Sequence, residues 1–170
     1  MTESENILNF TDEYFMAEAL KEAKKASDEG EVPVGAVIVF ENEIIARGRN
    51  RREKLNNALC HAEIEAINNA CEKLKSWRLL DCKLYVTLEP CPMCCGAIIN
   101  SRLKQVIYGA EDLKSGSCKS VINLFELPYN HKPFVTSGVL GKECSEILTS
   151  FFQLLRKNKS IKVCTENKKY

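Results

Sequence analysis

Residues 83–109 read KLYVTLEPCPMCCGAIINSRLKQVIYG, two β-branched apolar runs joined by a segment that contains prolines and cysteines. The runs 83–89 and 104–109 are typical of strands, and a helix is expected to begin between them at Pro92. Strand, helix and strand in this order favour a parallel crossover, because parallel neighbours need a long connection. This stretch therefore predicts a sheet that is covered by helices.

The remaining sequence predicts further elements around this unit, and no repeat, linker or low-complexity block interrupts them. We expect one three-layer α/β domain. Apolar periodicity and turn residues predict helices over 12–29, 61–75 and 142–157, a hairpin over 34–40 and 44–48, a short helix over 119–126 and a weak strand over 134–140.

Composition narrows the class of protein. The chain has 170 residues, 45% of them hydrophobic and 28% charged, which is normal for one soluble globular domain without a membrane span. Its nine cysteines are an odd number in a chain without signs of secretion, so reduced thiols or metal ligands are favoured over disulfides. Glu3 and Glu5 stand where a targeting signal would carry cations, so we expect a cytoplasmic protein.

A net charge of +1 conceals an uneven distribution of charge. Residues 156–170 hold six Lys and Arg against one acid, whereas residues 1–155 hold 18 against 22. We therefore expect a domain over 1–157 and a basic tail over 158–170. Such a tail can bind a polyanion, although a charged C-terminus is more often only a solvated end.

Cys91, Cys94 and His61 are candidate zinc ligands. If a helix begins at Pro92, the two cysteines lie on one face of its first turn, where the helix N-terminus favours thiolates. A cysteine pair alone is also compatible with a redox motif or a buried core. His61 opens its own helix, and because one strand separates the two helix starts, both can lie at the same edge of the sheet.

Glu63 separates a catalytic zinc site from a structural one. Three protein ligands leave a position for water, as in catalytic sites. Glu63 points away from His61 around the helix, so it can reach that water without binding the metal, and we expect it to shuttle protons. The alternative is an acid that merely favours the helix dipole.

The spacing H-x-E with P-C-x-x-C downstream is the signature of zinc nucleobase deaminases, and the chain resembles that superfamily. The motifs cover nearly the whole chain. More narrowly, it is similar to the bacterial tRNA-specific adenosine deaminases in EVPVGAVIV (31–39), HAEIEAI (61–67), LYVTLEPCPMCCGAII (84–99), VIYGAEDLKSG (106–116), the pair Asn130 and His131, and SFFQLLRK (150–157).

This resemblance implies a cytidine deaminase-like α/β/α fold, a five-stranded mixed sheet with helices on both faces, and a homodimer. It implies a deaminase domain that converts adenosine to inosine at the wobble position of the tRNA anticodon arm. His61, Cys91 and Cys94 would hold one Zn²⁺ per subunit, which activates the water that attacks C6. Glu63 would carry the protons.

The resemblance also implies contacts to RNA. Asn50 would bind the purine edge, and the Ala62 N–H would meet the base or developing charge. Phe151 and Phe152 would partly face the RNA loop, where stacking helps. Aromatic residues at helical spacing are more often core, however, so we expect at least one of the two to be buried. The remaining implied contacts form the pocket wall or grip neighbouring nucleotides: Val32, Pro33, Val34, Pro90, Asp112, Lys114 and Asn130. For Val32, Pro33 and Val34, simple entry into the buried strand is an alternative.

The chain departs from the family where Asn57, Ala58, Leu59 and Cys60 replace the common D-P-T-A, and where Gln153 replaces a frequent basic residue. Cys60 and Cys95 supply two additional sulfur atoms, and we expect neither to bind the metal. Two other functions remain open. One is a guanine or small-nucleotide deaminase of the same superfamily, and the other is a non-catalytic, zinc-stabilised RNA-binding module in which an extra cysteine completes the site.

Overall fold

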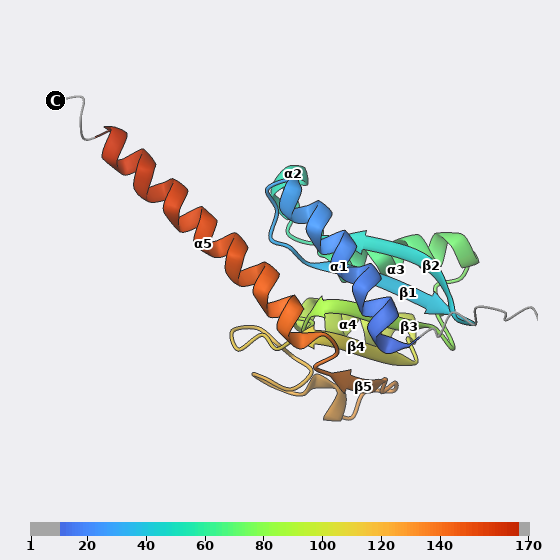
Figure 1. Ribbon diagram of the computed structural model, residues 1–170. Helices are drawn as coiled ribbons and strands as arrows, with labels where there is room; N and C mark the ends of the chain where they lie inside the picture. The colour runs from blue at the N-terminus through green and yellow to red at the C-terminus, as the bar shows by residue number, and fades with distance from the viewer. Residues whose placement is uncertain (1–10, 167–170) are drawn as a thin grey trace, which may run out of the picture.

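The computed structural model describes the backbone of residues 11–166 and the side chains of residues 11–158. Its centre is a five-stranded sheet in the order β2-β1-β3-β4-β5 (Figure 1). Strand β1 is antiparallel to both β2 and β3, and β3, β4 and β5 are parallel, so the sheet is mixed. The strands are β1 Gly35–Phe40, β2 Glu43–Arg49, β3 Lys83–Leu88, β4 Gln105–Ala110 and β5 Phe134–Ser137.

Helices cover both faces of this sheet. Alternate strand residues point to opposite faces, so Val37 and Tyr85 pack in one core with α1, while Ile38 and Leu84 pack in the other with α3 and α4. The predicted three-layer α/β/α architecture is confirmed. The helices are α1 Asp12–Asp28, α2 Arg52–Leu55, α3 Ala62–Leu74, α4 Pro92–Ser101 and α5 Gly141–Glu166, with a 3-10 turn, η1, at Leu124–Glu126.

Three elements differ from the sequence expectation. The short helix α2 was not expected. In place of the predicted helix over 119–126, the structure has only the 3-10 turn η1. Helix α5 runs past the expected end at 157 to Glu166, and its last part extends away from the body in Figure 1. Of the two phenylalanines in α5, Phe151 is 9% exposed and Phe152 is 42% exposed, as expected for one core residue. Among the described residues, no helix is long and apolar enough to cross a membrane.

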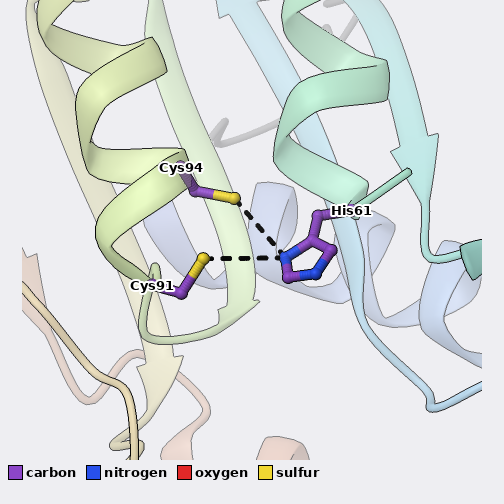
Figure 2. Close-up of side chains that lie close together, drawn as sticks. All are labelled: His61, Cys91 and Cys94. Carbon is purple, nitrogen blue, oxygen red and sulfur yellow. Dashed lines mark hydrogen bonds between the residues drawn. The ribbon is translucent and has the colours of Figure 1, made fainter. Parts of the chain in front are cut away.

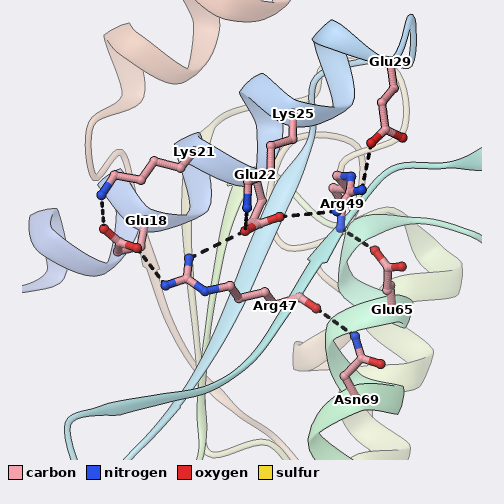
Figure 3. Close-up of polar contacts among 9 residues, drawn as sticks. All are labelled: Glu18, Lys21, Glu22, Lys25, Glu29, Arg47, Arg49, Glu65 and Asn69. Carbon is pink, nitrogen blue, oxygen red and sulfur yellow. Dashed lines mark hydrogen bonds and ion pairs between the residues drawn. The ribbon is translucent and has the colours of Figure 1, made fainter.

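Edge strand β2 is held between α1 and α3 by polar side chains (Figure 3). Arg47 and Arg49 pair with acidic residues of the α1 segment, including the buried Glu22 at 3.6 and 3.7 Å. From α3, Glu65 accepts the Arg49 N–H at 2.7 Å, and Asn69 donates to the Arg47 carbonyl at 2.9 Å. These contacts occupy backbone groups that an exposed edge would offer to another strand. The two contacts from Glu65 and Asn69 also fix α3, which carries the site, against the sheet.

Candidate metal centre and active site

Two helix starts bring the candidate ligands together at one edge of the sheet. Helix α3 begins directly after His61, and α4 begins at Pro92 directly after Cys91. Both His61 and Cys91 occupy N-cap positions, yet neither side chain caps its helix. Ligand side chains at these positions therefore stay available, and the free N–H groups of the helix ends favour thiolate.

The predicted ligands converge. The Nδ1 atom of His61 lies 3.7 Å from the Cys91 sulfur and 3.6 Å from the Cys94 sulfur, and the two cysteines approach it from α4 (Figure 2). All three ligand atoms lie within 4.8 Å of one another. One imidazole nitrogen and two thiols are donors that zinc prefers. The residues therefore fit a zinc ion, as the sequence predicted.

The neighbouring cysteines lie outside this group. Cys95 is buried, and its sulfur lies 3.7 Å from the Pro90 carbonyl oxygen and 3.7 Å from the Cys118 sulfur. Cys60 lines a separate surface pocket beside Ile64. Neither belongs to the metal-ligating cluster found among the described residues. A site with three protein ligands keeps a position for water, which is typical of catalytic zinc.

Hydrogen bonding shapes the charge of the cluster. The contact with Cys94, followed by the contact with His61, lowers the pKa of the Cys91 thiol to about 4. The hydrogen bond to Cys91 in turn raises the pKa of Cys94, and the contact with Cys91 also raises the pKa of His61. Cys91 and Cys94 therefore share one thiolate at neutral pH, and its negative charge favours the binding of a cation.

Glu63 lies in the first turn of α3 and is 4% exposed. Burial raises the pKa of its carboxyl above the ordinary value, and this effect exceeds the opposing effects of its hydrogen bonds and of His61. A carboxyl that titrates closer to neutrality can both accept and donate a proton. Glu63 lines the same cleft as His61 and Cys91. The predicted proton carrier therefore lies in the same cleft as two of the predicted ligands.

The cleft has a volume of about 160 Å³ and opens beside the carboxyl ends of β3 and β4. Ligands of α/β sheets commonly bind at this edge. Five predicted substrate residues line it, whereas buried Pro33 and Pro90 and exposed Lys114 and Asn130 do not. The lining residues are Val32, Val34, Asn50, Arg52, His61, Ala62, Glu63, Leu88, Glu89, Cys91, Asp112 and Ser115.

Asn50 is held in place by the surrounding protein. Its amide donates to the Val32 carbonyl at 3.3 Å and to Glu31 at 3.4 Å, and its oxygen accepts the Arg52 N–H at 3.4 Å. Glu31 is 1% exposed and also accepts the N–H groups of Glu53 and Lys54 at the start of α2. Sequence reasoning missed this buried carboxylate, and its position directly before the predicted wall residue Val32 was the available signal.

Glu89 is a second buried carboxylate that sequence reasoning missed. Burial would raise the pKa of Glu89, but hydrogen bonds from Ser120 and from the N–H groups of Asp112 and Lys119 outweigh it and hold the pKa low. The only signal in the sequence was its place directly before Pro90 and Cys91. Arg52 and Ser115 also line the cleft without having been predicted.

Comparison with known proteins finds relatives that match most of the chain. Residues 10–156 match the family model of the MafB19-like deaminases. The tRNA-specific adenosine deaminase of Bacillus subtilis (strain 168) is 52% identical over 87% of this chain and 92% of that protein. The chloroplastic tRNA(adenine(34)) deaminase of Arabidopsis thaliana is 46% identical over 84% of this chain but only 12% of its own length.

Solved structures also match this chain in fold. A structure from a study of A-to-I editing by tRNA:A34 deaminases at the wobble position has a TM-score of 0.78 and 46% identity, covering 79% of this chain and 99% of that chain. The guanine deaminase of Bacillus subtilis has a TM-score of 0.57 and 33% identity, covering 71% of this chain and 87% of that chain. The cytidine deaminase-like fold is thereby confirmed. With these relatives and this arrangement of His61, Cys91, Cys94 and Glu63, the chain belongs to the family of tRNA-specific adenosine deaminases.

Proposed function

We propose that this protein is a zinc-dependent hydrolase that converts adenosine to inosine at the wobble position of the tRNA anticodon. The observation that carries the proposal is the convergence of His61, Cys91 and Cys94 beside the buried Glu63 in one cleft. The names of relatives up to 52% identical support the tRNA substrate. We further propose a cytoplasmic homodimer with one zinc ion per subunit, as the family resemblance implies.

The reaction consumes water and releases ammonia. His61, Cys91 and Cys94 would hold the zinc ion, which lowers the pKa of a bound water toward neutrality. Glu63 takes a proton from the water as its oxygen attacks C6 of the adenine. The same carboxyl donates this proton to ring N1. It then takes the second proton from the new C6 hydroxyl and passes it to the leaving amine, so that the C6–N bond breaks, C6 keeps a carbonyl oxygen and ammonia departs. The raised pKa of Glu63 suits both directions of transfer.

The cleft would receive a base that is flipped out of the anticodon loop, where unpaired bases can be splayed and read along their edges. Asn50 and the Ala62 N–H supply polar contacts, and Val32 supplies an apolar wall. Asp112 of the cleft lining and the nearby Lys114 would contact neighbouring nucleotides. Asn130 would contact the RNA farther away, since its neighbour His131 lies against the Leu103 carbonyl, at the other end of β4 from the cleft. Pro33 and Pro90 would support the wall from behind, since both are buried outside the lining.

A guanine deaminase is the second candidate, favoured by the 33% identity to the solved Bacillus subtilis guanine deaminase. The relative with the greater structural likeness is the tRNA:A34 deaminase, with 46% identity and a TM-score of 0.78 against 0.57. We therefore place the tRNA substrate first. A purely structural zinc module has no use for a buried Glu63 beside three ligands.

One substrate panel tests the assignment. The purified protein is incubated with anticodon stem-loops that carry adenosine or guanosine at the wobble position, and separately with free guanine. Nucleosides are separated and identified by mass, and bound zinc is measured. We expect inosine only from the adenosine stem-loops. Zinc-loaded protein that makes no inosine from any stem-loop, or that converts guanine to xanthine, would overturn the assignment.

A further inference from the structure

Glu89 gathers a distant loop around its carboxylate. It follows β3 directly, two residues before Cys91, and is 2% exposed. Its oxygens accept the backbone N–H groups of Asp112 at 3.0 Å, Cys118 at 3.1 Å, Lys119 at 2.7 Å and Ser120 at 2.9 Å. The Ser120 hydroxyl donates to the same carboxylate. Five donors from one loop therefore meet a single side chain.

Neighbouring contacts hold the loop 112–120 to the same strand end. The Ser117 N–H donates to the Pro90 carbonyl at 2.9 Å, and the Cys118 and Cys95 sulfurs lie 3.7 Å apart. Gly116 leaves room for the carboxylate, because a Cβ atom there would collide with Glu89 Oε2. Two segments are therefore packed as one unit. One carries the metal ligand Cys91, and the other is the loop 112–120, which lines part of the cleft.

The loop matters because it reaches the cleft. Asp112 and Ser115 both line the cleft, together with Val32 and Asn50 from an earlier part of the chain. Asp112 itself accepts the N–H groups of Lys114 at 2.9 Å and Ser115 at 3.2 Å, which makes a tight turn at the mouth. Glu89 holds this turn in place, because the Asp112 N–H donates to the Glu89 carboxylate.

We propose that Glu89 is a positioning residue for the RNA substrate, which fixes the loop 112–120 as a rigid wall of the cleft. This inference rests on the proposed function. An ionised carboxylate accepts only and offers about four lone-pair sites, so its capacity is filled by the donors of the loop. Glu89 therefore has no free oxygen for proton transfer, and its role differs from that of Glu63. A glutamine would replace one acceptor by a donor that faces N–H groups.

The test compares Glu89→Gln, Glu89→Asp and Glu22→Gln in the full-length, zinc-loaded protein. With an adenosine stem-loop, we expect Glu89→Gln to raise KM by about tenfold or more, because charge-assisted hydrogen bonds to the loop are lost. Its kcat should stay within about twofold and its zinc content should be unchanged, since the substitution spares Glu63 and the ligands. Hydrogen exchange of the amides in 112–120 should accelerate. Glu89→Asp keeps the charge and should restore part of both effects.

Glu22→Gln is the matched control. Glu22 of α1 is also a buried carboxylate, but it pairs with Arg47 and Arg49 of β2 and does not line the cleft. We expect this variant to lower the melting temperature without changing KM or the exchange of 112–120. It separates a general loss of stability from a loss of positioning.

Three results would overturn the proposal. The first is an unchanged rate of amide hydrogen exchange in 112–120 of Glu89→Gln. The second is faster exchange in this variant with an unchanged KM. The third is a large fall in its kcat with an unchanged KM. The exchange measurement needs no turnover. If the wild-type protein made no inosine, the proposed function would fail, whereas faster exchange in Glu89→Gln would still establish the anchor.

Discussion

At the residue scale, the metal ligands were predictable because their geometry is local. Cys91 and Cys94 share a helical face through their spacing alone, and His61 occupies the matching position at the start of α3. Cys95 differs from Cys94 by one position, which is about 100° around a helix. That rotation turns its sulfur toward Cys118 rather than toward His61.

This rotation gives a paired prediction. Cys94→Ala should lose nearly all bound zinc, because only two of the three ligand atoms remain. Cys95→Ala should keep wild-type zinc and lose only about 1–2 kcal/mol of stability, as is usual for a small change in a packed core. Zinc per chain measured on the purified variants, with a thermal melt, checks both. Equal zinc loss in the two variants would contradict the ligand assignment.

Glu31 and Glu89 were not predictable from the sequence, for a physical reason. An acid beside a strand is ordinarily exposed, and only its hydrogen-bonding partners justify burial. The partners of Glu89 lie 23 to 31 residues away along the chain. Those of Glu31 lie 19 to 23 residues away. No local pattern shows that a distant loop will supply such donors.

At the element scale, the same two carboxylates lie beside two segments where the structure differs from the sequence prediction. Helix α2 has no apolar periodicity, but its first N–H groups donate to Glu31, which stabilises a single turn. In the region 119–126, the N–H groups of Lys119 and Ser120 donate to Glu89. Of the predicted helix over 119–126, the structure has only the 3-10 turn η1.

Two glycines give a contrasting prediction about how α3 and α4 are packed. A Cβ atom on Gly48 of β2 would collide with the backbone of α3 at Ala62, whereas one on Gly96 of α4 would meet nothing within 4 Å. Gly48→Ala should therefore displace the start of α3 and cost about 2–3 kcal/mol or more, as overpacking does. It should also weaken zinc binding, because that start carries His61.

Gly96→Ala should be neutral or stabilising by up to about 1 kcal/mol, since alanine is the better helix former. Chemical denaturation of both variants, with a zinc titration, measures the difference. A destabilised Gly96→Ala together with a tolerated Gly48→Ala would contradict the packing described.

At the scale of the whole molecule, the layered α/β class was predictable from the order of strands and helices, and most element positions followed from periodicity. The number of strands and the mixed sheet were implied by the family resemblance. The strand order and the antiparallel pairing of β1 with β3 were not predicted, because pairing depends on contacts between segments far apart in sequence. The length of α5 was also underestimated, since its apolar face ends near Leu155 while the helix continues to Glu166.

The uneven charge of the chain makes a prediction about RNA binding. The last 15 residues carry six Lys and Arg against one acid. Replacing Lys159 and Lys162 by glutamine should weaken stem-loop binding and lower the slope of log affinity against log salt by about 1 to 2. The control is the double substitution Lys73→Gln and Lys75→Gln at the end of α3 opposite the cleft, which should leave the slope unchanged. Equal effects in both variants would argue against a role for the tail.

The central claim is that the three ligands hold zinc while Glu63 moves the protons, and one side-by-side measurement tests it most directly. Wild-type protein and Glu63→Gln are loaded with zinc, and inosine formed from an adenosine stem-loop in a single turnover is measured together with zinc per chain. We predict one zinc ion per chain in both proteins, and a rate that falls by at least about 10²-fold in Glu63→Gln because general acid–base catalysis is lost. Wild-type turnover in Glu63→Gln, or loss of its zinc, would contradict the account.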